Sequence, residues 1–225
     1  MLDYYCKKYC CLAGLVLCVL MVLSMTAQAA QEGARVNKRI AIIPFEAVKA
    51  ASGSGNTVVC PVCGAAASGG KILEGSEKIV EEVFVNKMGE FEEIEIIPAS
   101  KVQSVYKKIS SSKQKETFVD VLRKAGKEIG ADFLAIGYVY RFVERVGYGY
   151  SSEHPASVAF EIHLIKTADG SILWRGFFDK TQKSLLENLF EISSFFRGGA
   201  KWVTAQELTE LGMDDVLDTF PDLEN

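Results

Sequence analysis

Apolar positions between residues 38 and 182 follow two spacings. Short runs that are almost wholly apolar, or that alternate apolar and polar residues, predict β-strands at 38–48, 91–98, 131–146, 156–166 and 171–180. Apolar residues three or four positions apart predict helices at 72–88, 98–109 and 116–129, with Gly89 and Gly130 as helix ends. This order favours one mixed β-sheet of about five strands packed with helices. The predicted fold is a single α/β (α+β) domain.

The segment 157–180 is predicted to form two paired strands, because "ADG" at Ala168–Gly170 is a strong turn signal. In its first strand Val158, Phe160, Ile162 and Leu164 share one face, and Ala159, Glu161 and His163 share the other. This alternation predicts one buried face and one that faces water. His163 is therefore predicted to be a solvated surface histidine.

The first 29 residues predict an export signal. Lys7 and Lys8 precede an apolar run from Tyr9 to Met25, and "AQA" at Ala27–Ala29 is a small-x-small cleavage site. We expect cleavage after Ala29, a linker over 30–37 and a location in the periplasm or cell envelope. The alternative is an uncleaved segment that anchors the chain in the inner membrane. A lipid anchor is not predicted, because Cys18 follows Leu17 and not a small residue.

Composition and charge exclude several classes of function. The chain has 225 residues, 24% of them charged, and a net charge of −4, so it lacks the basic character of a nucleic-acid-binding protein. It contains neither a phosphate-binding loop in register nor a Gly-x-Ser-x-Gly motif, and it has only two histidines, His154 and His163. The sequence therefore predicts a protein that is not an enzyme, with no obligate cofactor.

The one candidate chemical motif is Cys60-Pro61-Val62-Cys63-Gly64, within a loop over 51–70 that is rich in Gly, Ala and Ser. The other four cysteines lie within the predicted signal, so an exported protein favours a Cys60–Cys63 disulfide. A second interpretation is half of a zinc site, completed by His154 and His163 or by another chain. A thiol-disulfide redox centre is the third. It is less favoured, because seven small residues separate Cys63 from the next predicted helix.

Three motifs resemble a group of bacterial envelope proteins. They are "RIAIIPF" at 39–45, "GADFLAIG" at 130–137 and "ADGSILW" at 168–174. The group includes the curli-secretion lipoprotein, the lipoprotein activators of penicillin-binding proteins and the amino-terminal domain of the TolB translocation protein. The resemblance covers about residues 38–180. It implies a module that acts through contacts with other envelope proteins, and a homo-oligomer is one form such contacts can take.

The chain also departs from this group. The lipid-anchor cysteine of its lipoprotein members is missing, and the Cys60–Gly64 loop has no counterpart in them. The region 141–157 carries Arg141, Glu144, Arg145 and Glu153, so no alternating lipid-facing strand is present and an integral pore is not expected.

The last segment, 183–225, lies beyond the resemblance and is predicted to be a helical extension that packs on or beside the domain. Its "FFRGGAKW" sequence places Phe195, Phe196 and Trp202 beside two glycines, which makes these aromatics the candidate partner surface. The alternative is packing of a closing helix. The predicted function is thus a non-catalytic exported envelope protein that assists assembly or secretion. A zinc-binding or thiol-disulfide protein centred on Cys60 and Cys63 is the alternative.

Overall fold

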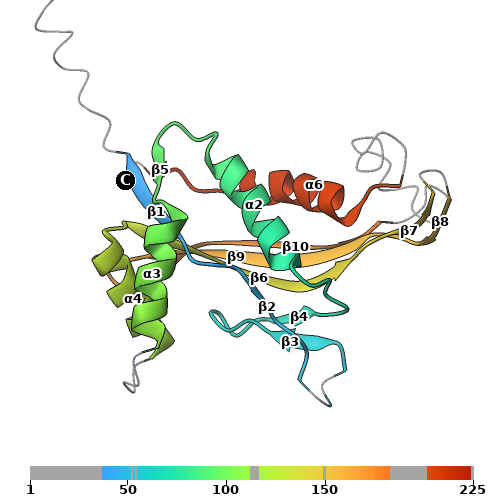
Figure 1. Cartoon of the computed structure of the whole chain (residues 1–225), viewed down its shortest axis with the longest axis horizontal. Helices are drawn as coiled ribbons and strands as arrows, with labels where there is room; N and C mark the ends of the chain where they lie inside the picture. Colours follow the sequence, from blue (N-terminus) through green and yellow to red (C-terminus); the bar gives the residue numbers. More distant parts are fainter. Residues whose placement is uncertain are drawn as a thin grey trace, which may run out of the picture. The chain divides into compact units, whose positions relative to one another are not determined.

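A six-stranded mixed sheet forms the centre of the computed structural model, which describes residues 37–51, 53, 55–111, 117–148, 151–182 and 202–223 (Figure 1). The strand order is β10–β9–β6–β1–β5, and β2 also pairs with β6. The strands are β1 (Lys38–Ile42), β2 (Glu46–Ala47), β5 (Ile94–Ile96), β6 (Phe133–Val143), β9 (Ser157–Lys166) and β10 (Ile172–Thr181). The predicted α/β class with one mixed sheet is confirmed.

The sheet joins a parallel half to an antiparallel half. Strand β1 runs parallel to both β5 and β6, and their connections contain the helices. Strands β6, β9 and β10 form an antiparallel meander, in which β9 pairs with β6 along one edge and with β10 along the other. The predicted hairpin around "ADG" is the β9–β10 connection.

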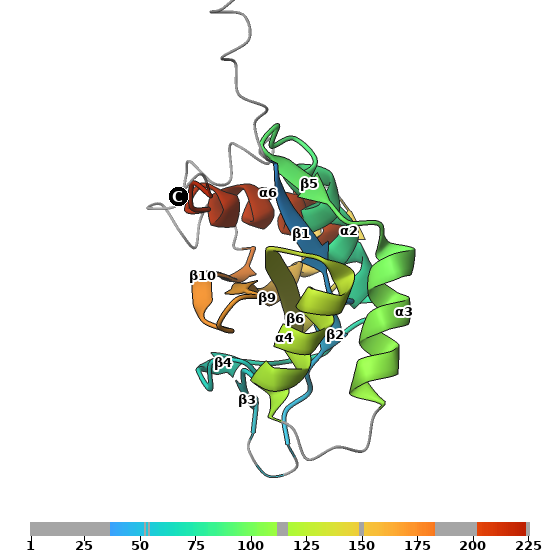
Figure 2. The same ribbon diagram turned by 90° about the vertical axis from the view of Figure 1, so that its left-hand side faces the viewer.

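Helices cover both faces of this sheet. They are α2 (Ser76–Met88), α3 (Ala99–Ser110), α4 (Phe118–Ile129) and α6 (Ala205–Leu217). Helices α2 and α6 pack on one face, and α3 and α4 lie against the other (Figures 1 and 2). Among the described residues, no helix is both long enough and apolar enough to cross a bilayer.

Helix ends follow the predicted local signals. Gly89 follows α2, and Gly130 ends α4 with a φ of 78°, a conformation that glycine adopts without steric cost. Just after Gly130, the Asp132 carboxylate accepts a hydrogen bond from the Arg39 amide at 2.9 Å, which ties the start of β6 to β1. Trp174 is 8% exposed, and its indole N–H donates to Thr219 Oγ1 at 3.1 Å, as expected of a buried anchor.

Several predicted boundaries differ from the structure. The predicted strand 38–48 is divided into β1 and β2 around Pro44, which cannot donate to a sheet. The predicted loop 51–70 contains a hairpin of β3 (Thr57–Val59) and β4 (Ala66–Ser68). A second small hairpin, β7 (Val146–Tyr148) and β8 (Ser151–His154), extends from β6. These strands are too short to show a clear alternation in the sequence.

Two predicted segments fall largely outside the described residues. These are the signal peptide and linker, of which only residue 37 is described, and residues 183–201 of the carboxy-terminal extension. Within that extension, α6 is described and packs against α2 and β10 through residues such as Leu208 and Val216.

Candidate metal centre

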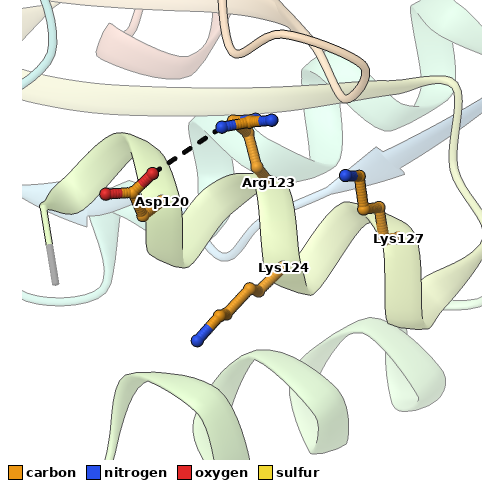
Figure 3. Close-up of a pocket in the computed structure, with 4 residues that line it drawn as sticks. All are labelled: Asp120, Arg123, Lys124 and Lys127. Atoms are coloured by element: carbon orange, nitrogen blue, oxygen red, sulfur yellow. Dashed lines mark ion pairs between the residues drawn. The ribbon is translucent and has the colours of Figure 1, made fainter. Parts of the chain in front are cut away.

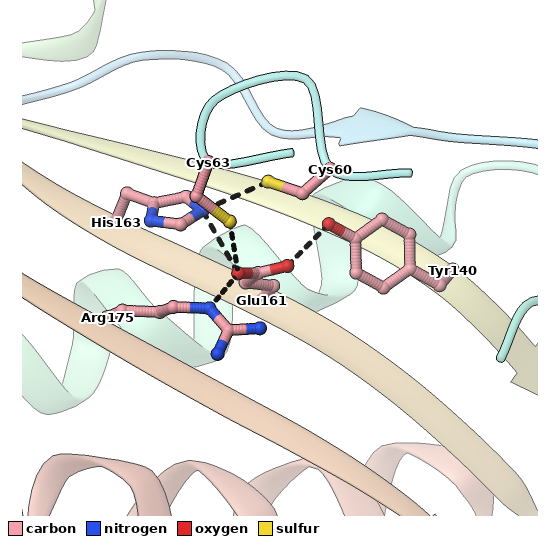
Figure 4. Close-up of polar contacts among 6 residues, drawn as sticks. All are labelled: Cys60, Cys63, Tyr140, Glu161, His163 and Arg175. Carbon is pink, nitrogen blue, oxygen red and sulfur yellow. Dashed lines mark hydrogen bonds and ion pairs between the residues drawn. The ribbon is translucent and has the colours of Figure 1, made fainter. Parts of the chain in front are cut away.

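The Cys60–Cys63 motif forms the turn that joins β3 to β4. The Cys60 amide donates to the Ala65 carbonyl at 2.8 Å, and the Gly64 amide donates to the Cys60 carbonyl at 3.0 Å. Gly64 has a φ of 72°, which explains why glycine follows the second cysteine. The turn therefore has a defined backbone conformation that presents both side chains to the sheet (Figure 4).

Beneath this turn lie Glu161 and His163 of β9. Residues two apart on a strand point to the same face, so both side chains are directed toward the turn. Both residues are fully buried, with 0% of their surface exposed. The prediction that this face of β9 is wet, and that His163 is a surface histidine, is therefore wrong. The alternation predicted a face exposed to solvent, but the β3–β4 hairpin and the helices on that side cover it and exclude water.

Four potential ligand atoms converge at this point. His163 Nε2 lies 3.1 Å from Cys60 Sγ and 3.2 Å from Glu161 Oε1. The Cys63 thiol donates to Glu161 Oε1 at 3.4 Å. All four atoms lie within 4.8 Å of one another (Figure 4).

Two further side chains hold the Glu161 carboxylate. Arg175 of β10 contacts Oε1 through its Nε, and its backbone lies directly opposite His163 in the sheet. The Tyr140 hydroxyl of β6 donates to Oε2 at 2.7 Å. Both carboxylate oxygens are thus satisfied, which is the condition for a carboxylate to be stable in a buried position.

These contacts set the ionisation of the carboxylate. Burial alone raises the pKa of Glu161, but the hydrogen bonds from His163, Arg175 and Tyr140 outweigh it and hold that pKa well below its usual value. Burial, followed by the hydrogen bond to Glu161, raises the pKa of Tyr140 far above its usual value. Glu161 is therefore an anion, and Tyr140 is its neutral donor.

The two thiols differ in the same environment. Burial raises the pKa of Cys60, but the hydrogen bond from the Cys63 backbone, together with the neighbouring polar groups, outweighs it, so the net shift is downward. Burial, with Cys60 and the Glu161 charge, raises the pKa of Cys63. The pKa of His163 is raised, because its hydrogen bonds with Glu161 and Cys60 outweigh the effect of burial.

The arrangement fits a tetrahedral metal ion. Bond lengths of about 2.3 Å for Zn–S and about 2.0–2.2 Å for Zn–N and Zn–O place tetrahedral ligand atoms about 3.3–3.8 Å apart. Three of the six separations between the four atoms are 3.1–3.4 Å, close to that range, and all six are within 4.8 Å before any adjustment of the side chains. Charge is also balanced. The two thiolates and one carboxylate carry three negative charges. A divalent ion and the Arg175 guanidinium carry three positive charges.

One polar atom of the cluster has no partner. His163 Nδ1 is buried and makes no hydrogen bond among the described residues. Buried polar atoms without partners are rare in folded proteins and each calls for a physical explanation. A metal ion bound at Nε2 would leave Nδ1 without a partner as well, so this atom does not distinguish the two interpretations of the cluster.

The predicted site residues have different outcomes. Cys60 and Cys63 are free thiols here, so the expected disulfide is not formed. His163 joins the cysteines, whereas His154 is exposed on β8 and takes no part in the cluster. Of the candidate partner surface, Phe195 and Phe196 lie outside the described residues, and Trp202 is half-buried.

Glu161, Tyr140 and Arg175 were not assigned to a site from the sequence. A signal for Glu161 was present, because β6 is apolar on both faces and β9 was predicted to follow it in the chain. A strand that is apolar on both faces must be covered by other parts of the protein on both faces. Polar residues of the adjacent strand, Glu161 among them, are then buried by the same segments.

A hollow on α4 is lined only by charged side chains. Asp120, Arg123, Lys124 and Lys127 line it, with Arg123 paired to Asp120 at 3.7 Å (Figure 3). Arg123 and Lys127 point to one side of the helix, and Lys124 points away toward α3. This composition is typical of a solvated helix surface, and we assign no site to it.

Comparisons of sequence found no relative. No known protein family and no curated protein matches the chain.

Comparisons of structure found several bacterial proteins. The LpoB C-terminal domain from Salmonella enterica shares 9% identity over 70% of this chain and 92% of that one, with a TM-score of 0.41. The PelC dodecamer from Paraburkholderia phytofirmans shares 12% identity over 82% of this chain and 86% of that one, with a TM-score of 0.43. Lipoprotein GNA1162 from Neisseria meningitidis shares 13% over 72% and 98%, with a TM-score of 0.40.

These similarities concern the fold alone and assign no role to individual residues. LpoB is a penicillin-binding-protein activator lipoprotein, so the structural neighbours include the envelope group that the sequence resembles.

Proposed function

We propose that this chain is a non-catalytic α/β module that binds one zinc ion through Cys60, Cys63, Glu161 and His163. The observation that carries the proposal is the convergence of these four ligand atoms within 4.8 Å, from two segments about a hundred residues apart in the sequence. The bound ion fastens the β3–β4 turn to β9. Its role is to hold the hairpin in place.

The donor set selects the class of metal. Thiolate and imidazole ligands favour zinc and other soft or borderline ions, whereas calcium and magnesium require oxygen ligands. Four protein ligands close a tetrahedral shell, which is typical of structural zinc sites. Catalytic sites keep one position for water or substrate.

The test is the metal content of the full chain, purified under reducing conditions and measured by native and denaturing mass spectrometry. We expect one zinc ion per chain in the native spectrum, and Cys60 and Cys63 as free thiols after denaturation. His163→Ala is expected to abolish stoichiometric binding. His154→Ala is the matched control, and it is expected to bind zinc as the wild type does, because His154 is exposed on β8.

Two results would contradict the proposal. One is a chain that binds no zinc in a competition titration against a chromophoric chelator although both thiols are free. The other is a purified chain that gains two mass units on reduction and holds no metal, which would support the structural disulfide instead.

We also propose that the module is exported and acts through contacts with other envelope proteins, other copies of itself included. The sequence motifs and the export signal predicted over 1–29 support this proposal. The neighbours LpoB and GNA1162 are of the same envelope type, and PelC forms a dodecamer. The intact mass of the envelope-derived protein tests export, with a start at Ala30 expected. Sedimentation of the same sample tests self-association.

A further inference from the structure

One of the four ligand residues is open to solvent. Cys63 is exposed, whereas Cys60 is 2% exposed and Glu161 and His163 are fully buried. Cys63 therefore offers a reagent a route from the surface to the centre without any opening of the sheet. Structural zinc sites that are fully buried lack this route.

The same two sulfurs can serve either a metal or a disulfide. Cys60 and Cys63 are three residues apart in one turn, and that turn is closed by the hydrogen bonds to the Ala65 carbonyl and from the Gly64 amide. A disulfide brings the sulfurs to about 2.05 Å and removes both thiolate charges. What remains is His163 and a Glu161 carboxylate already paired with Arg175, which is too few ligands to retain zinc.

We propose that the centre is a redox-released latch, in which oxidation of Cys60 and Cys63 expels the zinc ion and frees the tip of the β3–β4 hairpin. This inference rests on the proposed zinc site and adds its regulation. The oxidant is a molecule with an accessible disulfide bond, such as oxidised glutathione or a disulfide-exchange protein.

The chemistry takes two exchange steps. The Cys63 thiolate attacks one sulfur of the oxidant, which forms a mixed disulfide and expels the other sulfur as a thiolate. The Cys60 thiolate then attacks the Cys63 sulfur, which forms the Cys60–Cys63 bond and expels the second thiolate. Two electrons pass from the protein to the oxidant, which is reduced to two thiolates, and the zinc ion leaves as the hydrated ion.

The effect is confined to the tip because the hairpin has a second attachment at its base. There, Arg141 donates to the Ser68 carbonyl at 3.2 Å, and the Gly70 amide donates to the Tyr140 carbonyl at 2.9 Å. At the tip, the side-chain hydrogen bonds between the described residues of the hairpin and β9 are those of the two sulfurs with His163 and Glu161. Oxidation removes these hydrogen bonds and leaves those at the base.

The experiment treats the zinc-loaded full chain with oxidised glutathione and follows three signals. A chromophoric chelator reports free zinc, peptide mapping by mass spectrometry reports the Cys60–Cys63 disulfide, and hydrogen exchange reports the opening of the hairpin. We expect one zinc ion released per disulfide formed. Amides of residues 60–65 are expected to exchange about tenfold faster or more, with 70–73 and α4 unchanged.

Two variants separate the latch from general loosening. Cys63→Ser cannot form the disulfide, and we expect the amides of residues 60–65 in this variant to exchange at the same rate before and after oxidised glutathione is added. Arg141→Gln weakens the base of the hairpin in both redox states, and we expect it to keep the full response to oxidant at the tip.

The outcomes distinguish the two proposals. A reduced chain that binds no zinc overturns the proposed function and this inference together. A chain that binds zinc but keeps it after the disulfide forms overturns only the latch. Zinc release without faster exchange at 60–65, or with disulfides between chains in place of Cys60–Cys63, also overturns the latch alone.

Discussion

The two faces of the central sheet are built from the same strands but contain different chemistry. The face under α2 and α6 is lined by aliphatic and aromatic side chains, among them Phe160, Trp174 and Phe178. The opposite face is apolar where α3 and α4 cover it, and it carries the buried polar cluster beneath the β3–β4 hairpin (Figures 2 and 4).

Strand β9 shows the contrast within one element. Its residues on the α2–α6 side include Phe160 and Ile162, and alternating with them are Glu161 and His163 on the hairpin side. Apolar burial stabilises the fold in proportion to the area removed from water. Burial of ionised groups costs free energy unless they are fully paired, and an apolar replacement is often no less stable. Apolar packing on both faces thus stabilises the fold, and the buried polar cluster on the hairpin side indicates a function.

The largest expected effect is a loss of folding stability from a substitution on the apolar face under α2 and α6. Phe160 is fully buried, and its ring lies 5.3 Å from that of Phe178, so Phe160→Ala is expected to lower the free energy of unfolding by about 3–5 kcal/mol. Urea unfolding should give the same loss with zinc and with a chelator. Phe177→Ala is the control, since Phe177 is 39% exposed on the other face, and its cost is expected to stay below about 1 kcal/mol. Equal losses for the two variants would show that the comparison of faces is wrong.

The second effect depends on the metal. Zinc at a hundredfold excess over its dissociation constant is expected to raise the free energy of unfolding by about 2.7 kcal/mol. Glu161→Gln keeps the size of the side chain and removes its charge. If it weakens zinc binding a hundredfold, the stabilisation at the same free zinc falls to about 0.4 kcal/mol. Unfolding at buffered zinc concentrations measures both values, and an unchanged stabilisation would show that Glu161 binds only Arg175 and Tyr140.

A smaller effect concerns the helix that covers the apolar face. Thr204 begins α6 with a capping box, in which its side chain accepts from the Glu207 amide and the Glu207 side chain accepts from the Thr204 amide. Thr204→Ala is expected to cost about 1 kcal/mol, and Thr204→Ser much less, because serine is also a favoured cap. Thermal unfolding of both variants is the measurement. A loss that depends on zinc would contradict the separation of the two faces.

The smallest expected effect is a pH dependence of the melting temperature that arises from α4, on the opposite face of the sheet. The hydrogen bond from Thr117 is the largest cause that lowers the pKa of Asp120, in the first turn of α4. Because the pKa of Asp120 is lower in the folded chain than in the unfolded chain, its stabilising effect is fully present above the pKa of the unfolded state. The effect is lost as the pH falls through the pKa of the folded state. Between about pH 5 and about pH 3, the melting temperature of the wild type is therefore expected to fall slightly more than that of Asp120→Asn. Parallel curves would show that this bond does not contribute.

The local sequence determined much of this protein. Apolar runs predicted the strands, apolar residues three or four positions apart predicted the helices, and Gly89 and Gly130 marked helix ends. These features depend on residues that are close together in the chain. The same local rules placed Ile162 and His163 on opposite faces of β9 correctly. They also identified Cys60 and Cys63 as the motif with chemical potential.

Only the tertiary structure decided what surrounds those residues. Alternation along β9 separates two faces, but it does not say whether a face is covered by water or by another segment. Here the β3–β4 hairpin covers Glu161 and His163, and it brings Cys60 to within 3.1 Å of a histidine 103 residues away. Such a contact depends on how distant segments pack, and no local pattern contains it. For that reason the sequence supplied half of the proposed metal site, and the fold supplied the rest.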